Sequence, residues 1–323
     1  MRRLRYLEAM NEAYHQEMER DPSIFILGED IRGNLRGETR GLLERFGSGR
    51  VLDTPISEAA FVGFGTGAAM AGMRPIVQFQ IATLIYLAFD QLVNNAAKMR
   101  LMMGGQATVP VTYTIMATGA RNGLAGQHAD NPYPYFLHAG IKTVCPANAY
   151  DAKGLLISAI REDDPVGFFA PAGCMAQRGD VPEEPYAIPL GQGEVKREGS
   201  DVTVIAIGQM VAEALRVAET LAEEGISVRV WDPRTLLPLD KDGACAAAAA
   251  TGRVVIYDDA NRTCGFAAEL SALLAERVFD ELKAPIKRVT RADVPISFSA
   301  PLEQAALPSE AGLITAIRAV CGG

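Results

Sequence analysis

One carboxylate stands in a stretch of the chain that is otherwise nearly free of charge. Residues 53–66 read Asp-Thr-Pro-Ile-Ser-Glu-Ala-Ala-Phe-Val-Gly-Phe-Gly-Thr, and Glu58 opens an apolar run that extends to Met73. A carboxylate at the start of a tightly packed helix is costly to bury unless something binds it. If it is bound there, it can hold or share a proton near neutral pH. The alternative is a helix-start glutamate that the helix dipole favours, with Ser57 as the N-cap.

A histidine lies in the second stretch that could do chemistry, the glycine-rich and aromatic loop at residues 119–135. This loop follows a predicted strand over residues 109–115, and loops at the carboxyl ends of parallel strands form the ligand sites of such sheets. His128, with Asp130 nearby, is therefore a candidate site residue able to move a proton. The alternative is a surface histidine beside a solvated acid.

A glycine pattern follows Glu58 and matches a nucleotide-binding motif in letters only. Gly63-x-Gly65-x-x-Ala68 fits the GxGxxA fingerprint, which should follow a strand and be succeeded by an acid at the end of a second strand. Here the next predicted strand, residues 74–80, carries Gln78 and Gln80 instead. The glycines are better interpreted as close-packing positions, which suit a helix at a subunit interface as well as a nucleotide site.

Composition excludes several classes of function. The formal net charge of -8 argues against nucleic-acid binding, which needs a basic face. The longest apolar stretch, residues 59–73, is too short to span a bilayer, and the basic N-terminus is not followed by an apolar signal core. The 5 cysteines are scattered without a CxxC pair, so neither a zinc site nor a disulfide framework is predicted. We expect a cytoplasmic protein.

The elements that must position these residues alternate between strands and helices, which is typical of parallel sheets covered by helices. A proline-rich stretch at residues 171–190 is predicted to link two α/β domains, 1–185 and 191–323, each with a mainly parallel sheet flanked by helices. One helix, predicted over residues 85–103, is apolar on several faces and should therefore be buried, in the chain or by a partner. The other predicted strands are 24–27, 142–146, 166–170, 202–207, 227–231, 254–258 and 286–289, and the other predicted helices 148–162, 211–224, 267–278 and 310–320.

Runs of residues spread over nearly the whole chain match one family. They include Gly28-Glu29-Asp30, Arg50–Glu58, Asp90-Gln91, Gly104-Gly105-Gln106, Gln127-His128, Asp151–Leu156 and Arg234-Thr235-Leu236-x-Pro238-Leu239-Asp240. The chain in this respect resembles the β subunit of the thiamine-diphosphate-dependent decarboxylase component of 2-oxo acid dehydrogenase complexes. That family includes the pyruvate, branched-chain and acetoin dehydrogenases.

The resemblance implies a pyrimidine-binding domain followed by a transketolase C-terminal-like domain. It also implies an α₂β₂ heterotetramer, active only with its α subunit, in which thiamine diphosphate lies between subunits. The α subunit would hold the diphosphate and Mg²⁺, and this chain indeed lacks a Gly-Asp-Gly motif followed by Asn-Asn. Glu58 would hydrogen-bond the N1′ nitrogen of the aminopyrimidine and so favour the tautomer that takes up the C2 proton, while the cofactor serves as electron sink for decarboxylation.

Other residues take their expected roles from the same resemblance. His128 would stand near the substrate or the lipoyl entrance as a proton donor or electrostatic stabiliser. Ile56, Ile81 and Leu84 would line the aminopyrimidine pocket. A potassium ion would lie at the segment with Ala159, Glu162 and Asp164, held largely by backbone oxygens. A lipoyl acyltransferase would be the further partner.

The chain departs from the family around His128 and the pocket. It reads Ala129-Asp130-Asn131 where the family has Ser-Gln-Ser, Tyr133 where a glutamate is usual, and Leu84 where an aromatic is usual. These changes leave Glu58 in place but bear on the substrate. Which 2-oxo acid is used, and whether an acyltransferase complex forms, therefore stay open. The alternatives are a two-chain carboligase or transketolase-like enzyme without a lipoyl acceptor, and a non-catalytic scaffold.

Overall fold

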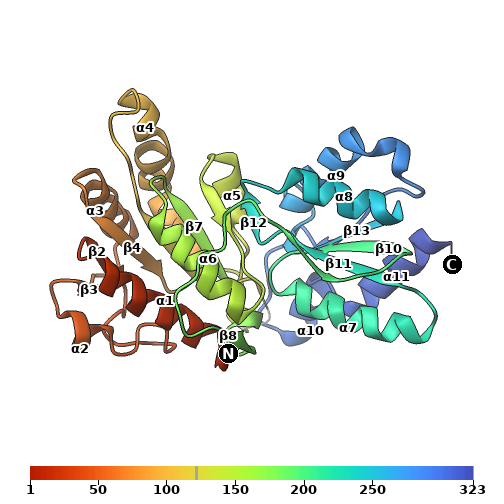
Figure 1. The fold of residues 1–323 in the computed structure, drawn as a ribbon, viewed down its shortest axis with the longest axis horizontal. Coiled ribbons are helices and arrows are strands. Elements are labelled where there is room, and N and C mark those ends of the chain that lie inside the picture. The colour runs from red at the N-terminus through yellow and green to blue at the C-terminus, as the bar shows by residue number, and fades with distance from the viewer. Residues whose placement is uncertain (121–122, 323) are drawn as a thin grey trace. The chain divides into compact units, whose positions relative to one another are not determined.

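The computed structural model describes residues 1–120 and 123–322, and Figure 1 shows the course of the chain. The chain forms two compact units. The first unit consists of Met1–Thr118 and Tyr135–Leu190, and the second of Gly119–Pro134 and Gly191–Gly323. The glycine-rich loop therefore packs with the second unit, although the strand before it belongs to the first. Two residues of this loop, 121–122, lie outside the described residues.

A parallel sheet forms the centre of the first unit. Its six strands there lie in the order β6-β7-β5-β4-β2-β3, and each neighbouring pair is parallel. Such sheets are covered on both faces, which explains why their strands are buried along most of their length. The strands are β2 Ile24–Gly28, β3 Val51–Asp53, β4 Arg74–Phe79, β5 Thr112–Thr118, β6 Lys142–Val144 and β7 Val166–Pro171; β1 Arg2–Arg5 and β8 Arg178–Val181 form a separate antiparallel pair.

Helices α1 (Tyr6–Arg20) and α6 (Ala149–Arg161) pack against each other on one face of this sheet, where Ile76 of β4 joins their core. Helix α3 (Glu58–Met70) covers the opposite face, because the next residue of β4, Val77, points to it. The approach of α3 is close: a Cβ added at Gly65 would lie 2.5 Å from Cγ2 of Val77. The close-packing interpretation is therefore confirmed at Gly65. The shorter helices of this region are α2 Leu42–Phe46, α5 Tyr133–His138 and the 3-10 turn Ala172–Cys174.

The segment predicted as one long helix over residues 85–103 is helical from Ala82 to Met102, but it is not one regular α-helix. The segment consists of a 3-10 helix (Ala82–Ala88), a π-helix (Asp90–Ala97) and the short α4 (Lys98–Met102). Side chains compete with the helical backbone here, because Asn95 Nδ2 donates to the main-chain oxygen of Asp90 at 3.3 Å. Leu87 is 67% exposed and Leu101 84% in the chain alone, so of the two predicted ways to bury this segment only a partner could cover these side chains.

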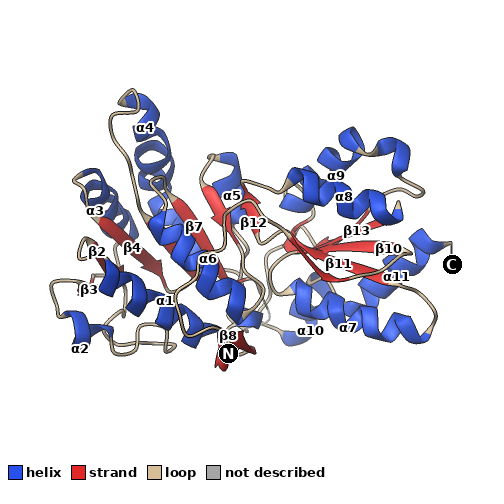
Figure 2. Cartoon of the chain, in the orientation of Figure 1, coloured by secondary structure: helices blue, strands red, loops and turns tan. Residues whose placement is uncertain are grey.

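The second unit holds a five-stranded sheet in the order β14-β13-β10-β11-β9, parallel except for β9 at one edge. From β10 the chain first adds β11 on one side and later β13 on the other, which makes a topological switch point at β10. Figure 2 shows helices on both faces of this sheet. The elements are β9 Glu194–Arg197, β10 Val202–Ala206, α7 Met210–Glu223, β11 Val228–Asp232, β12 Thr235–Leu237, α8 Lys241–Thr251, β13 Val254–Asn261, α9 Phe266–Arg277, a 3-10 turn Phe279–Glu281, β14 Lys287–Arg291, α10 Ala300–Ala306 and α11 Glu310–Cys321.

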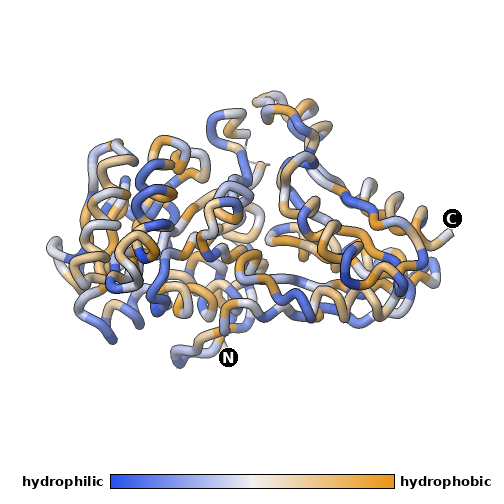
Figure 3. Tube along the Cα trace, turned by 90° about the horizontal axis from the view of Figure 1, so that it is seen from above, coloured by the Kyte–Doolittle hydropathy of each residue, from blue (hydrophilic) through white to orange (hydrophobic). Residues whose placement is uncertain are grey.

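Hydrophobic and hydrophilic stretches alternate along the chain in Figure 3, and the buried strands β5, β7, β10 and β13 supply hydrophobic ones. Among the described residues, we find no helix that is both long and apolar enough to cross a membrane.

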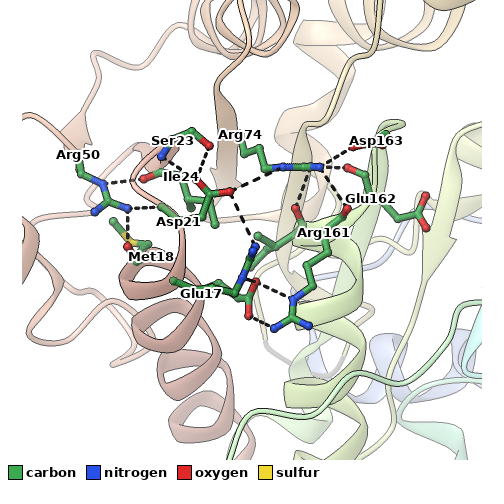
Figure 4. A network of polar contacts seen from close by, with 12 residues as sticks. Glu17, Met18, Asp21, Ser23, Ile24, Arg50, Arg74, Arg161, Glu162 and Asp163 are labelled. Carbon is green, nitrogen blue, oxygen red and sulfur yellow. Dashed lines mark hydrogen bonds and ion pairs between the residues drawn. The ribbon is translucent and has the colours of Figure 1, made fainter.

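A polar network joins α1 to α6 in the first unit (Figure 4). The Glu17 side chain is only 1% exposed and lies between two arginines. Arg20 Nε donates to its Oε2 at 2.9 Å, and Arg161 donates to both of its oxygens at 3.0 and 2.7 Å. The fold thus buries a carboxylate here with a complete set of cationic donors.

Candidate functional site

Glu58 is the first residue of α3 and is buried, with 4% of its surface exposed. Ser57 is the N-cap residue, as the sequence suggested, but its side chain makes no capping hydrogen bond. Oε1 of Glu58 is enclosed and has no hydrogen-bond partner among the described residues. A buried acceptor in that condition is costly unless a donor reaches it. The site therefore fits a ligand that offers an N–H or O–H group.

A second carboxyl group stands beside Glu58. Glu29 follows β2, is 9% exposed, and its carboxyl lies close enough to Glu58 for the two side chains to interact. Burial raises the pKa of Glu29, and the neighbouring charges of Glu58 and Asp30 raise it further. Two carboxyl groups in contact favour a state in which they share one proton. Sequence reasoning missed Glu29 as a candidate site residue, although it lies just beyond the predicted strand 24–27, in the Gly28-Glu29-Asp30 run.

The main chain at Glu29 is fixed by its neighbours on β4. Gly28 has φ of +151°, and a Cβ there would lie 2.2 Å from the main-chain oxygen of Gln78, so only glycine fits. Gln80 Nε2 donates to the Glu29 carbonyl at 2.9 Å, and the Gln80 side-chain oxygen accepts from Arg36. The carboxyl of Glu29 is thus held close to Glu58 by a rigid frame.

The three apolar residues predicted around the cofactor ring occupy two places in the first unit. Ile56 lies two residues before Glu58 and is 82% exposed. Ile81 and Leu84 are half-buried in a turn closed by the Leu84 amide, which donates to the Ile81 carbonyl at 3.2 Å. This turn begins the segment that packs against α3. All three therefore lie on elements adjoining the start or the side of the helix that carries Glu58.

His128 lies in the second unit, whereas Glu58 lies in the first. The histidine is half-buried in a turn, with its amide donating to the Ala125 carbonyl at 3.1 Å. Contacts from neighbouring loop residues hold this turn on the second unit: Asp130 pairs with Arg291, Asn131 Nδ2 donates to the Asp259 carbonyl at 3.0 Å, and the Tyr133 hydroxyl donates to Asp258.

Asp258 and Asp259 lie near the end of the buried part of β13, and sequence reasoning missed both. Burial raises the pKa of Asp258, although the hydroxyl of Tyr133 and two main-chain amides donate to it. The side chain of Asp259 accepts from Gln209 Nε2 at 2.6 Å. These residues mark the switch point between β10 and β13, where parallel sheets usually bind ligands. Here residues of the loop that carries His128 fill that place.

The residues predicted to hold potassium already have protein partners. Lys142 pairs with Glu162 and with Asp164, and the Ala159 carbonyl accepts from the Thr112 hydroxyl at 3.1 Å. Within residues 1–120 and 123–322, no three His, Cys, Asp or Glu side chains gather as a metal site. The carboxylates of Glu162 and Asp164 therefore neutralise Lys142, and a cation at this turn would have to be held by main-chain oxygens.

The two units match the two halves of one class of protein. Residues 2–175 match the transketolase pyrimidine-binding domain and residues 191–313 the transketolase C-terminal domain. A solved split-gene transketolase, an inactive beta4 tetramer, superposes with a TM-score of 0.74 at 23% identity over 98% of this chain and 97% of that one. The chain thus has the two-domain transketolase fold.

Curated relatives define the family more closely. The chain is 43% identical to the acetoin:2,6-dichlorophenolindophenol oxidoreductase subunit beta of Bacillus subtilis, over 94% of this chain and 92% of the relative. It is 41% identical to the pyruvate dehydrogenase E1 component subunit beta of Rickettsia felis, over 97% of both chains. It is 41% identical to the 2-oxoisovalerate dehydrogenase subunit beta of Bacillus subtilis, over 92% and 91%. The chain belongs to the β subunits of the thiamine-diphosphate-dependent E1 enzymes of 2-oxo acid dehydrogenases.

Proposed function

We propose that this chain supplies the carboxylate that activates thiamine diphosphate in a two-chain enzyme acting on a small 2-oxo acid. The observation that carries the proposal is the buried Oε1 of Glu58, which has no donor among the described residues. The N1′ nitrogen of an aminopyrimidine, once protonated, is a donor of the kind this oxygen needs. When bound, the cofactor supplies a nucleophilic carbon and an electron sink for decarboxylation.

Each carboxyl of the pair takes one part in this scheme. Glu58 binds and orients the ring and holds a proton at its oxygen or gives it to the ring nitrogen. Burial and the charge of Glu58 raise the pKa of Glu29, so this carboxyl takes up a proton more readily than an exposed glutamate and can limit the negative charge in the enclosed site. The apolar side chains of Ile56, Ile81 and Leu84 exclude water from the ring.

His128 is proposed to act on the substrate side, where an imidazole can donate a proton or stabilise a developing negative charge. A lipoyl group on an acyltransferase is proposed as the acceptor of the acyl product. The predicted compartment is the cytoplasm; named relatives also include mitochondrial subunits of plants.

An α subunit is proposed to complete the site in an α₂β₂ assembly. It would hold Mg²⁺ and the diphosphate, because this chain has no motif for either. The apolar side chains that the chain alone leaves exposed, among them Phe64 on α3 and Leu87 and Leu101 beyond β4, provide a surface for subunit contacts. A potassium ion is proposed at main-chain oxygens of the segment with Ala159, Glu162 and Asp164, because the two carboxylates are paired with Lys142.

The test is reconstitution. The chain is co-expressed with its candidate α subunit, and turnover of pyruvate and of branched-chain 2-oxo acids is followed with an artificial electron acceptor. We expect turnover only when both chains, thiamine diphosphate and Mg²⁺ are present. Turnover by either chain alone, or turnover that does not depend on the cofactor, would overturn the proposal.

A two-chain carboligase or transketolase-like enzyme is the second candidate. The loop around His128 favours it, because Tyr133 and Asp130, which replace the usual family residues, bind this loop to the second unit. Supplying the assembly with aldehyde acceptors or with a lipoylated domain separates the two. Product formed only with aldehydes would favour the carboligase.

A further inference from the structure

We propose that Arg291, with Asp130 and Asn261, is a positioning group that fixes the loop carrying His128 and so sets the efficiency of the reaction at that histidine. The inference rests on the proposed function for its kinetic part alone. Arg291 ends β14 and Asn261 ends β13, and the two residues are paired in register. Asp130 comes from the loop, two residues after His128.

The guanidinium of Arg291 joins the two strand ends to the loop. Its side chain is 5% exposed, its Nε donates to Asn261 Oδ1 at 2.8 Å, and its Nη2 pairs with Asp130 Oδ1. The same Asp130 oxygen accepts the Asn131 amide at 2.8 Å, and the Asp130 carbonyl accepts the Gly119 amide at 2.7 Å. One acidic residue thus closes the loop on itself and attaches it to the sheet.

Electrostatics favour this pair. Burial by itself would lower the pKa of Arg291, but the charge and hydrogen bond of Asp130, together with the charges of Asp259 and Tyr133, outweigh burial and leave the pKa above its ordinary value. The arginine therefore stays charged, and a buried charge of this kind needs its partner in place. If the loop left the sheet, the guanidinium of Arg291 would either become exposed to solvent or stay buried without its partner Asp130.

The apolar contacts under the loop are too small to hold it without the contact of Arg291 with Asp130. The apolar cluster under the loop contains Ala120, Ala129, Ile296 and Ala306, of which the loop supplies only two alanine side chains. Alanines bury little apolar surface. A cavity of about 310 Å³ borders the same contacts, lined by Gly126, Asp130, Arg291 and residues 293–296 among others. The polar contacts therefore hold the turn with His128 in place.

The first readout is amide hydrogen exchange of the full chain over residues 123–131. Arg291→Met should speed exchange there by roughly tenfold or more, the scale of one charge-assisted hydrogen bond, and Arg291→Lys by less. Arg288→Met is the matched control, since Arg288 lies on the same strand and donates to the Arg262 carbonyl. Unchanged exchange in Arg291→Met, or equal effects in Arg291→Met and Arg288→Met, would contradict the proposal that Arg291 anchors the loop. Asp130→Asn provides a second way to break the contact if Arg291→Met does not fold.

The second readout is a double-mutant cycle on kcat/KM in the assembly with the α subunit. Arg291→Met should lower kcat/KM by about tenfold in the wild-type background and have no further effect beside His128→Ala, because residues that act as a unit are not additive. Equal losses in both backgrounds would show a general structural role and contradict the proposal. If no thiamine-dependent turnover exists at all, the proposed function fails, while the exchange experiment still decides the anchor.

Discussion

Two buried glutamates of the first unit, Glu17 and Glu58, have opposite surroundings. Glu17 receives hydrogen bonds from Arg20 and Arg161 on both of its oxygens (Figure 4). Glu58 has a carboxyl, Glu29, as its neighbour and one enclosed oxygen without a partner among the described residues. The chain is therefore able to satisfy a buried carboxylate, and it does not do so at Glu58.

The different hydrogen-bond partners of the two carboxylates indicate which of them is available to a ligand. A buried carboxylate with matching cations stabilises the fold that contains it, whereas one beside a second carboxyl group destabilises it until a donor arrives. Natural proteins retain such costs at functional sites. From this comparison we propose that Glu17 is structural and that Glu58 is kept for a ligand, and the substitutions below test the proposal.

The largest effect is expected for Glu58→Gln in the assembled enzyme. Turnover should fall by about 100-fold or more, because the amide cannot hold and return a proton as the carboxyl does. The melting temperature of the chain alone should stay equal or rise, since a buried carboxyl pair has been removed. Steady-state turnover and calorimetric melting check both parts, and near-normal turnover would refute the assigned role.

Glu17→Gln should show the reverse pattern. Loss of the charge-assisted bonds from Arg20 and Arg161 should lower the free energy of unfolding by about 2 kcal/mol, while turnover per folded assembly stays unchanged. Urea denaturation measures the loss. Glu19→Gln is the control on the same helix, where the pair with Arg45 is exposed and contributes less than about 1 kcal/mol. Equal losses in the two variants would remove the contrast.

The distance of α3 from β4 is tested by Gly65→Ala. The new Cβ would lie 2.5 Å from Val77 Cγ2, so overpacking should cost about 1–2 kcal/mol of unfolding free energy. Gly67→Ala on the same helix meets nothing within 4 Å and should stabilise the chain alone by up to about 1 kcal/mol. Denaturation curves compare them, and a tolerated Gly65→Ala would mean that close packing does not position Glu58.

The smallest effect is expected for Glu29→Gln, whose effect on the melting temperature should depend on pH. The pKa of Glu29 is raised above the ordinary 4.5 in the folded chain, so the folded state binds more protons than the unfolded state between 4.5 and the raised value. Stability should therefore fall as pH rises through this window. Glu29→Gln should raise the melting temperature at pH 7 by roughly 1–3 °C, with the gain vanishing below pH 4.5. A gain that is the same at both pH values would argue against the raised pKa.

The alternation of strands and helices could be predicted because parallel strands are continuous apolar runs, as in β7 and β10. The helix types within residues 82–102 could not be predicted, because a side-chain bond from Asn95 to the main-chain oxygen of Asp90 competes with the regular helical pattern. Glu58 was predictable as a lone carboxylate in an apolar stretch. Glu29 and Arg291 were not, because their importance comes from contacts with residues 29 and 161 positions away in the sequence.

We propose that Glu58 is reserved for a cofactor at a site that needs two chains. We would measure thiamine diphosphate binding with Mg²⁺ by titration calorimetry, for the chain alone, for the assembly with its α subunit, and for the Glu58→Ala assembly. We predict that the wild-type assembly binds the cofactor. The chain alone and the Glu58→Ala assembly should bind it much more weakly or not at all. Tight binding by this chain alone, or unchanged binding by the Glu58→Ala assembly, would contradict the proposal.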